Sequence, residues 1–168
     1  HLTYDRFPNS PPFTLGHEFS GIVEKTGPDV ISVSVGERVV SENNPGACGT
    51  CPVCRKGFPN LCPNKRAMGI HSDGAFAEYL LLPAELLHNI PDSIDSADAA
   101  LMEPVAVSIH TLSSEAAVEE GDVVVVLGPG AIGLLCAQIA RAKGAKMVIV
   151  AGTGTDADNR LVLAGDMG

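Results

Sequence analysis

Hydrophobic residues in the first half of the chain come in short β-branched runs that turn residues interrupt. Between residues 19 and 40, these runs alternate with glycine, proline and aspartate, which is typical of short strands joined by tight turns. Strand character returns over residues 75–82 and ends at Pro83, which cannot continue the hydrogen bonding of a strand. Residues 43–64 contain too few apolar side chains to pack without help. The pattern predicts a barrel-like β domain with a lobe that a metal ion stabilises.

The middle of the chain has the composition of two short helices. Asp92 or Ser93 is suited to cap a first helical turn. Residues 97–114 have helical composition that Pro104 interrupts, and proline favours the first turn of a helix. A second helix is therefore expected to begin near Pro104, and the passage between two domains is expected here.

The last third of the chain has the order strand, helix, strand. Residues 122–127 contain an unbroken apolar run, as expected of a parallel strand that is covered on both faces. Residues 131–143 place apolar side chains at helical spacing, and residues 146–151 form a second apolar run. Residues 159–167 are expected to form the next helix. This order predicts a βαβ unit and a parallel sheet.

Composition narrows the class of protein and of partner. A hydrophobic content of 45% over 168 residues allows a buried core, and a net charge of -9 disfavours nucleic acid and anionic lipid surfaces as partners. No apolar run is long enough to span a membrane, and the start of the chain lacks the features of a secretion signal. The cytoplasm is therefore the expected compartment. Because the chain opens on His1, it is expected to be a piece of a longer protein.

Four cysteines within fifteen residues indicate a metal site. Cys48, Cys51, Cys54 and Cys62 are separated by two, two and seven residues, a spacing that can wrap a tetrahedral Zn²⁺. Four thiolates leave no position for a substrate, so such an ion would contribute folding energy. Two disulfides, free thiols and an iron-sulfur cluster are the alternatives. Cys136 lies on the apolar face of a predicted helix and is interpreted as a core residue.

A histidine and a glutamate stand side by side just before the first predicted strand. His17 and Glu18 lie between Gly16 and Gly21, and such a pair on its own is more typical of a surface or supporting position than of a metal site. The pattern continues with Gly27 and Val30, then the four cysteines, the segment 103–107 and His110. In this order it resembles the zinc alcohol dehydrogenase signature of the medium-chain dehydrogenase/reductase family, and in particular its polyol (sorbitol or xylitol) dehydrogenase branch.

The resemblance covers nearly the whole chain and implies a mixed α/β fold with two domains. Residues 1–107 would form an incomplete GroES-like β-barrel catalytic domain that carries a structural zinc lobe at residues 43–64. Residues 108–168 would form the first βαβ unit of a Rossmann NAD(P)-binding domain. Relatives of this kind are commonly homodimers or homotetramers, and the same assembly is implied for the full-length protein.

The resemblance also implies roles for individual residues. His17 would be a ligand of a catalytic zinc ion, and Glu18 or Glu103 would bind the same ion directly or through water. His1 aligns with a histidine that belongs to a proton relay near the cofactor ribose. The family supplies a further cysteine ligand upstream of that histidine. This sequence begins too late to contain it, so the 168 residues alone are expected to show little or no turnover.

A glycine-rich turn follows the first apolar strand of the βαβ unit. Gly128, Gly130 and Gly133 form a G-x-G-x-x-G pattern between that strand and the next helix. In this context the pattern predicts a dinucleotide-binding turn, with the pyrophosphate at the start of the helix, at Ala131 and Ile132. The alternative is that the glycines merely end a strand in another kind of α/β unit.

The tip of the second strand leaves the choice of dinucleotide open. An Asp or Glu is expected there to bind the ribose hydroxyls of NAD, but residues 151–154 contain no acid. Asp156 or Asp158 would serve the ribose of NAD, whereas Thr153 and Arg160 would accept the 2′-phosphate of NADP. NAD is slightly preferred at this point.

Together these features favour an oxidoreductase that transfers a hydride between a secondary alcohol or polyol and NAD(P). A catalytic zinc ion with an open coordination position would act as a Lewis acid on the substrate oxygen. Two alternatives remain: a metal-stabilised structural or binding module without catalytic activity, and a relative of quinone reductases without catalytic zinc. Relatives of quinone reductases generally lack both the four cysteines and the His-Glu pair. The small-molecule substrate itself is not specified by these residues.

Overall fold

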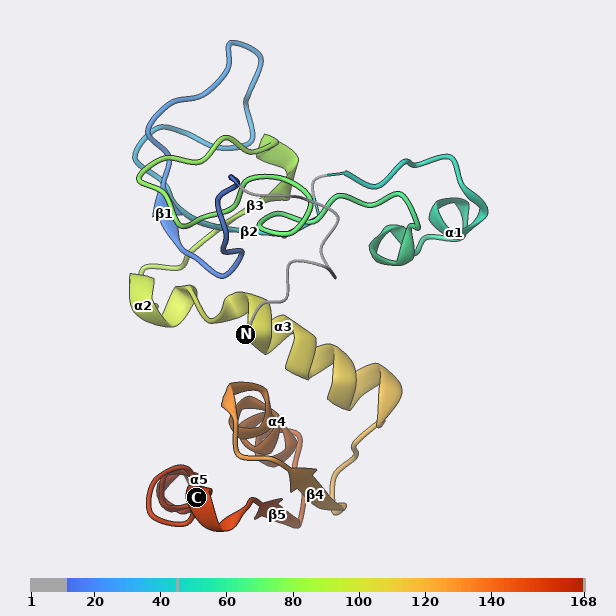
Figure 1. Ribbon diagram of the computed structural model, residues 1–168, viewed down its shortest axis with the longest axis vertical. Coiled ribbons are helices and arrows are strands. Elements are labelled where there is room, and N and C mark those ends of the chain that lie inside the picture. The colour runs from blue at the N-terminus through green and yellow to red at the C-terminus, as the bar shows by residue number, and fades with distance from the viewer. Residues whose placement is uncertain (1–11, 45, 168) are drawn as a thin grey trace. The chain divides into compact units, whose positions relative to one another are not determined.

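The computed structural model describes residues 12–44 and 46–167, and the chain divides into two compact units (Figure 1). The first unit is His1–Glu103 and the second is Pro104–Gly168. The division falls within helix α3 (Met102–His110), four residues before the boundary between residues 107 and 108 that the family resemblance implies. His1 lies outside the described residues. Strands and helices together give the predicted mixed α/β fold.

A three-stranded antiparallel sheet forms the centre of the first unit. Strand β2 (Arg38–Ser41) lies between β1 (Gly21–Ile22) and β3 (Leu87–Asn89). Side chains of the sheet and of the loops beside it form a small aliphatic core; the buried members are Val23, Val33 and Val39, and Val30, Ala84 and Leu87 pack against them. The alternation of β-branched and turn residues therefore predicts this sheet correctly, except that β3 has no strong signal in the sequence.

The strand predicted over residues 75–82 is wrong. The backbone amides of Ala75 and Phe76 donate hydrogen bonds to the carbonyl oxygens of Gly16 and Leu15, but no ladder continues beyond them. Phe76 is 77% exposed and Leu81 is 96% exposed. Because no neighbouring strand in the described residues lies alongside this segment, its β propensity is not realised.

Short helices connect the sheet to the rest of the chain. The lobe carries α1 (Pro52–Arg55) and a 3₁₀ turn (Pro59–Leu61). Helix α2 (Ser96–Ala99) begins with Asp95, whose side chain accepts a hydrogen bond from the amide of Asp98 at 2.8 Å. Neither of the predicted caps, Asp92 and Ser93, has this role. A short polar side chain directly before the first helical residue is what caps a helix.

Helix α3 contains Pro104 as its third residue and continues into a π-helical turn (Thr111–Glu115). Proline is tolerated there because the amides of the first turn have no partner within the helix. The helix begins at Met102. The sequence predicts a start near Pro104, which is two residues later.

The second unit has the predicted βαβ order. Parallel strands β4 (Val123–Leu127) and β5 (Met147–Ala151) flank helix α4 (Ala131–Ala142) along the chain. A 3₁₀ turn (Gly154–Asp156) then leads into α5 (Arg160–Asp166). The two strands and the two α-helices agree with the sequence prediction to within two residues, whereas the sequence does not predict the 3₁₀ turn.

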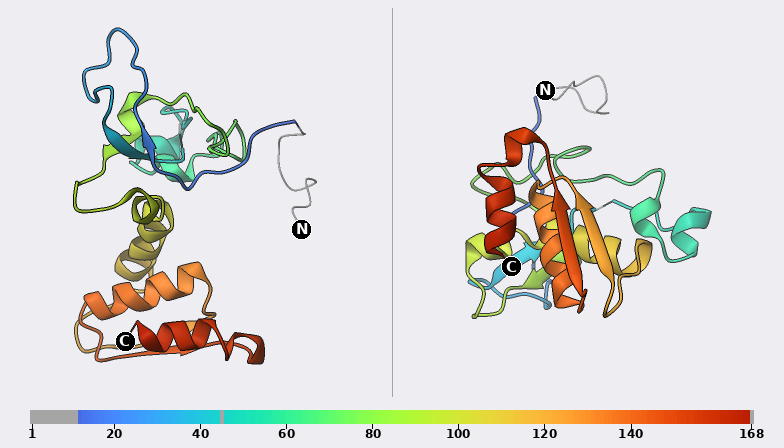
Figure 2. Two further views of the ribbon diagram at one scale, coloured as in Figure 1. Left: turned by 90° about the vertical axis from the view of Figure 1, so that its left-hand side faces the viewer. Right: turned by 90° about the horizontal axis from the view of Figure 1, so that it is seen from below.

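The two helices α4 and α5 cover one face of this two-stranded sheet (Figure 2). A hydrophobic core lies on this face of the sheet. Its buried members are Leu112, Val118, Val126, Cys136 and Ala140. The alternate residues of β4 point to the other face, where Leu127 is 82% exposed. Cys136 is a core residue, as predicted. Among the described helices, none combines the length and the apolar character that crossing a bilayer requires.

Candidate metal sites and dinucleotide turn

The four clustered cysteines converge on one point of the lobe. Their sulfur atoms all lie within 4.8 Å of one another. The Sγ–Sγ distances include 3.5 Å between Cys48 and Cys62, 3.9 Å between Cys51 and Cys62, and 4.0 Å between Cys48 and Cys54. Four sulfurs at about 2.3 Å from a tetrahedral zinc ion are about 3.8 Å apart, whereas a disulfide requires about 2.05 Å. The donor set therefore fits a zinc ion.

Backbone amides point at the same sulfurs. The amides of Cys51 and Cys54 donate to the Sγ atoms of Cys48 and Cys51, each at 3.4 Å. The Cys51 side chain caps helix α1, and Pro52 begins that helix. Small residues between the cysteines permit tight turns. These turns bring the sulfur atoms and their amide donors to one place.

The proton affinities of the thiols differ within the cluster. The pKa of Cys48 is lowered to about 6, chiefly by a hydrogen bond from the backbone of Thr50. The pKa of Cys54 is raised to about 12, chiefly by desolvation and also by the neighbouring cysteines. A metal ion that binds all four as thiolates has to displace the proton of Cys54. Metal affinity of this cluster therefore rises with pH.

A second group of metal-binding side chains lies in the first unit. One ligand atom each of His17, Glu18 and Glu103 lies within 4.8 Å of the others. His17 and Glu103 are half-buried, while Glu18 is exposed. An imidazole and carboxylates are zinc ligands, and three protein ligands with an open position are typical of catalytic zinc sites. The donor set fits such an ion.

Glycines hold the backbone just before His17 in close contact with a distant loop. A Cβ atom on Gly74 would lie 2.2 Å from the carbonyl oxygen of Gly16, and one on Gly69 would lie 2.5 Å from the same oxygen. The amide of Gly74 donates to the carbonyl oxygen of Thr14 at 2.8 Å. Only residues without a side chain allow the two backbones to approach this closely, so Gly69 and Gly74 allow the backbone just before His17 to lie against this loop.

Asn43 is the immediate polar neighbour of Glu103. Its Nδ2 donates a hydrogen bond to Oε1 of Glu103 at 2.6 Å, although the two residues are 60 positions apart in the sequence. Burial raises the pKa of Glu103, while the neighbouring His17 lowers it. Burial therefore disfavours the negative charge of this carboxylate, and a bound cation would offset that cost. A partly buried carboxylate held by an amide donor is a suitable metal ligand.

The sequence indicates some of these residues and misses others. The structure brings together His17, Glu18 and Glu103, and the four cysteines, while His1 falls outside the described residues. Asn43 and the two glycines at positions 69 and 74 are not indicated by any local pattern. Asn43 stands among other turn residues, and only its long-range contact distinguishes it from them.

The glycine-rich turn has the geometry of a dinucleotide-binding turn. Gly128 has φ +99, a conformation that side chains disfavour, and a Cβ atom on Gly133 would lie 1.9 Å from the carbonyl oxygen of Gly128. Around Gly130, in contrast, the space for a Cβ atom is open. Helix α4 begins at Ala131, directly after Gly130. The tight turn, the close packing of helix on strand and the free space match the three roles of the glycines in such turns.

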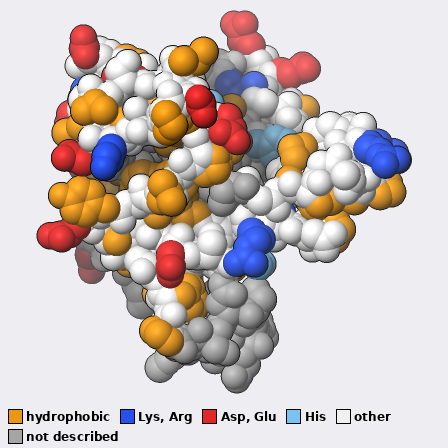
Figure 3. Space-filling model, turned by 90° about the horizontal axis from the view of Figure 1, so that it is seen from above, with side chains coloured by type: hydrophobic (Ala, Val, Ile, Leu, Met, Phe, Trp, Pro, Cys, Tyr) orange, Lys and Arg blue, Asp and Glu red, His pale blue; other side chains and the backbone are white. Residues whose placement is uncertain are grey.

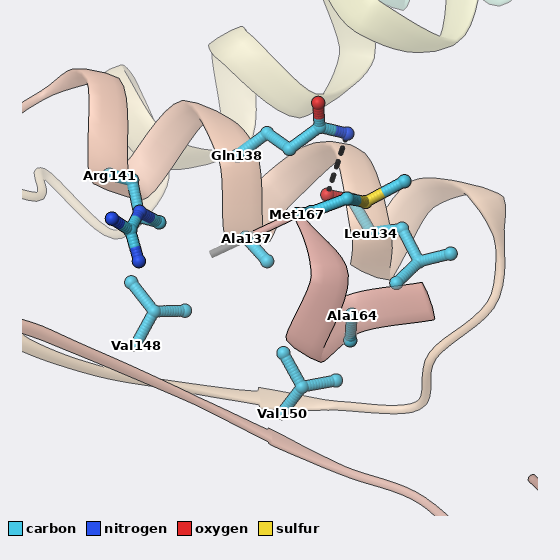
Figure 4. A pocket seen from close by; sticks show the side chains of 8 residues that line it. All are labelled: Leu134, Ala137, Gln138, Arg141, Val148, Val150, Ala164 and Met167. Carbon is cyan, nitrogen blue, oxygen red and sulfur yellow. Dashed lines mark hydrogen bonds between the residues drawn. The ribbon is translucent and has the colours of Figure 1, made fainter. Parts of the chain in front are cut away.

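A small crevice in the second unit is separate from this turn. It lies between α4, β5 and the end of α5 (Figure 4), and its lining is formed by Leu134, Ala137, Gln138, Arg141, Val148, Val150, Ala164 and Met167. The side-chain Nε2 of Gln138 donates to the carbonyl oxygen of Leu134 at 3.3 Å. Most of the lining is apolar, and none of the predicted site residues contributes to it. The crevice is therefore a packing gap and not a candidate site.

One face of the molecule shows how its charges are distributed. Hydrophobic and acidic side chains are interspersed there, and the few lysine and arginine side chains in view are separated from one another (Figure 3). On this face, the described residues do not form a continuous basic surface of the kind that binds a phosphate backbone.

A comparison with protein families decides the classification. The family model of the alcohol dehydrogenase GroES-like domain matches residues 1–92, more than half of the chain. The chain belongs to this family. Dehydrogenases are also among its curated relatives. The chain is 41% identical over 149 residues to a sorbitol dehydrogenase of Halalkalibacterium halodurans, a match that covers 89% of the chain and 43% of the relative.

Further relatives of this alcohol dehydrogenase-like chain agree with that result. It is 41% identical over 157 residues to a D-arabitol-phosphate dehydrogenase of Enterococcus avium, covering 94% of the chain and 44% of the relative. Among solved structures, a zinc-binding dehydrogenase from Sinorhizobium meliloti bound to NADP matches with a TM-score of 0.89 and 42% identity. That match covers 100% of the chain and 48% of the solved chain. The chain thus spans less than half the length of these relatives.

Proposed function

We propose that the protein is a zinc-dependent oxidoreductase that transfers a hydride between a secondary alcohol or polyol and NAD(P). The observation that carries this proposal is the grouping of His17, Glu18 and Glu103 within 4.8 Å. It occurs in a chain that belongs to a dehydrogenase family and also carries a dinucleotide turn. A structural module without activity would account for the four cysteines, but not for this second group or for the turn.

Each part of the chain has a separate task in this proposal. Residues 1–107 form the catalytic domain, and residues 108–168 begin the NAD(P)-binding domain; the division into compact units between residues 103 and 104 supports nearly the same assignment. When bound, a catalytic zinc ion supplies a Lewis acid for the substrate oxygen, and the nicotinamide accepts the hydride. Assembly as a homodimer or homotetramer and a cytoplasmic location remain predictions.

His17 and Glu103 are the side chains that we assign as ligands of the catalytic zinc. Glu103 is half-buried and its Oε1 already accepts a hydrogen bond from Asn43, which leaves its other oxygen for a metal. Glu18 is exposed and adjacent, so we assign it a supporting role. Gly128, Gly130 and Gly133 provide the turn, and the amides at Ala131 and Ile132 face the pyrophosphate at the start of α4.

The His17→Ala variant tests the proposed function. The full-length protein is expected to contain about two zinc ions per chain and the variant about one, because only the structural ion remains. Reduction of NAD(P) with sorbitol or xylitol should fall about 10³-fold, since the Lewis acid contributes several kcal/mol. Metal analysis and cofactor absorbance measure the two effects.

His88→Ala is the matched control for this experiment. His88 lies in the same unit, and its Nε2 is 3.2 Å from Oε1 of Glu42 in a largely exposed pair, which contributes little to stability. The control should keep both zinc ions and its activity. A His17→Ala protein that behaves like the control would refute the proposal.

Asn43 is expected to act as a positioning residue for Glu103. Asn43→Leu removes the amide donor but keeps a side chain of similar size. The affinity of the catalytic zinc should fall about 10- to 100-fold, as is typical when the hydrogen-bond partner of a metal ligand is lost. Competition with a chelator measures this affinity, and the structural zinc should be unaffected.

Asn89 offers a matched control for Asn43. Its Nδ2 donates to Oε2 of Glu37 at 3.3 Å on the surface of the same unit, and neither residue belongs to a metal-binding group. Asn89→Leu should leave both zinc affinities unchanged. Equal losses in the two variants would show that Asn43 acts on general stability and not on Glu103.

A further inference from the structure

The tip of strand β5 lacks a free carboxylate where a dinucleotide would place its adenosine ribose. This inference rests on the proposed NAD(P)-dependent function. β5 ends at Ala151 and is followed by Gly152 and Thr153. A dinucleotide-binding unit that prefers NAD places an acid at this point, where it accepts hydrogen bonds from the 2′-hydroxyl group. None of Ala151, Gly152 and Thr153 carries an acid that could bind the 2′-hydroxyl group.

Asp156, the nearest acid along the chain, is engaged within its own turn. Its Oδ2 accepts hydrogen bonds from the amide of Thr153 at 2.9 Å and from the hydroxyl group of Thr153 at 2.8 Å. Its Oδ1 lies 3.8 Å from Nη1 of Arg160, and its side chain is only 15% exposed. The backbone hydrogen bond of Thr153 lowers the pKa of Asp156. This carboxylate is turned toward the protein, where it closes the turn.

The same turn lies directly beside the glycine-rich loop. A Cβ atom on Gly152 would lie 3.0 Å from Cγ of Pro129, which is in that loop, and 3.1 Å from Cβ of Asp156. The amide of Gly128 donates to the carbonyl oxygen of Ala151 at 2.8 Å. Groups on the 153–160 segment are thus close to the place where the pyrophosphate would bind.

A cationic group remains accessible on this segment. The Arg160 side chain is 61% exposed while it stays beside Asp156. The hydroxyl group of Thr153 donates to Asp156 and lies 2.8 Å from that of Thr155, so these hydroxyl groups are engaged within the turn. A guanidinium group presents several donors in a plane that matches a phosphate group. Asp156 limits the freedom of Arg160 and so helps to orient it.

We infer that this chain selects NADP over NAD, with the guanidinium group of Arg160 binding the 2′-phosphate. This inference differs from the slight preference for NAD that the sequence alone suggests. Asp158, which is exposed on the same segment, is the rival group: as a ribose ligand it would favour NAD.

Calorimetric titration of the full-length protein with two fragments of the cofactors tests the inference. Adenosine 2′,5′-bisphosphate carries a phosphate group at the 2′ position, whereas AMP is otherwise identical and has a free 2′-hydroxyl group. The bisphosphate should bind at least about tenfold more tightly than AMP. Arg160→Gln should weaken its binding about 10- to 100-fold, as expected for the loss of hydrogen bonds from a charged group, and should change AMP binding less than about twofold.

Arg141→Gln is the control, because it removes the same charge from an exposed position in the last turn of α4. It should leave both affinities unchanged. Arg160→Lys keeps the positive charge and should retain part of the preference, and thermal unfolding followed by circular dichroism confirms that each variant is folded.

Several outcomes would overturn the inference. Tighter binding of AMP than of the bisphosphate, or an unchanged preference in Arg160→Gln, would exclude this role of Arg160 and leave the proposed dehydrogenase function intact. A loss of AMP binding in Asp158→Asn would identify Asp158 as the ribose ligand, with the same consequence. If neither fragment binds, the NAD(P)-dependent function fails as well.

Discussion

Replacing Cys62 with serine is expected to remove one zinc ion per chain and to unfold the lobe of residues 43–64. Cys62 is the only buried residue among the described residues of the lobe, and Phe58 and Leu61 are 53% and 63% exposed. The lobe therefore has no apolar core that could hold it together once the ion is lost. Binding of a structural zinc ion contributes roughly 10–16 kcal/mol to the folding of comparable small units.

Metal analysis and limited proteolysis measure the two consequences. The zinc content should fall from about two ions to about one. Trypsin should then cut rapidly after Arg55 and Lys56, which are exposed in and beside α1, because a protease requires a locally unfolded segment. A strong chelator at neutral pH should make the unchanged protein equally sensitive, and lower pH should hasten the effect because the thiols are reprotonated.

Cys136→Ala provides the control for the loss of a cysteine. This residue is buried in the core of the second unit and is remote in sequence from the lobe. Its replacement should leave the zinc content and the tryptic pattern of the lobe unchanged. If Cys62→Ser kept its full zinc content and its resistance to trypsin, the four cysteines would not form a zinc site.

The βαβ unit could be predicted well because its signals are local. An unbroken apolar run marks β4, apolar residues at helical spacing mark α4, and Gly128 and Gly133 mark the turn between them. Each element is determined by residues within itself, and the parallel pairing of β4 and β5 follows from their connection through a helix. Sequence periodicity is informative wherever neighbouring residues decide the structure.

The first unit could be predicted less well because its structure depends on contacts between distant segments. Residues 75–82 have strand composition but lack a neighbouring strand, whereas Leu87–Asn89 pairs with β2 although it has little strand signal. The hydrogen bond between Asn43 and Glu103 joins residues 60 positions apart. The sequence shows which side chains could bind a metal; the contacts that orient them appear only in the folded chain.

The substitution Gly74→Ala is expected to disrupt the catalytic metal site from outside it. The added Cβ atom would lie 2.2 Å from the carbonyl oxygen of Gly16 and 2.7 Å from Cα of Gly69, so the two backbones have to separate. Gly16 directly precedes His17, and the movement would displace that imidazole from Glu103. We expect a loss of about 1–3 kcal/mol in the free energy of unfolding and a loss of about 10²-fold in activity, as a shift of about 1 Å can cause.

The zinc content distinguishes this mechanism from general destabilisation. Gly74→Ala should lose the catalytic ion at low free zinc concentrations and keep the structural ion, because the four cysteines belong to a separate lobe. Gly27→Ala is the matched control in the same unit, since its Cβ atom would meet only Cγ2 of Val30 at 3.7 Å, an ordinary contact. The control should keep both ions and its activity. Full activity in Gly74→Ala would mean that the position of His17 does not depend on this glycine contact.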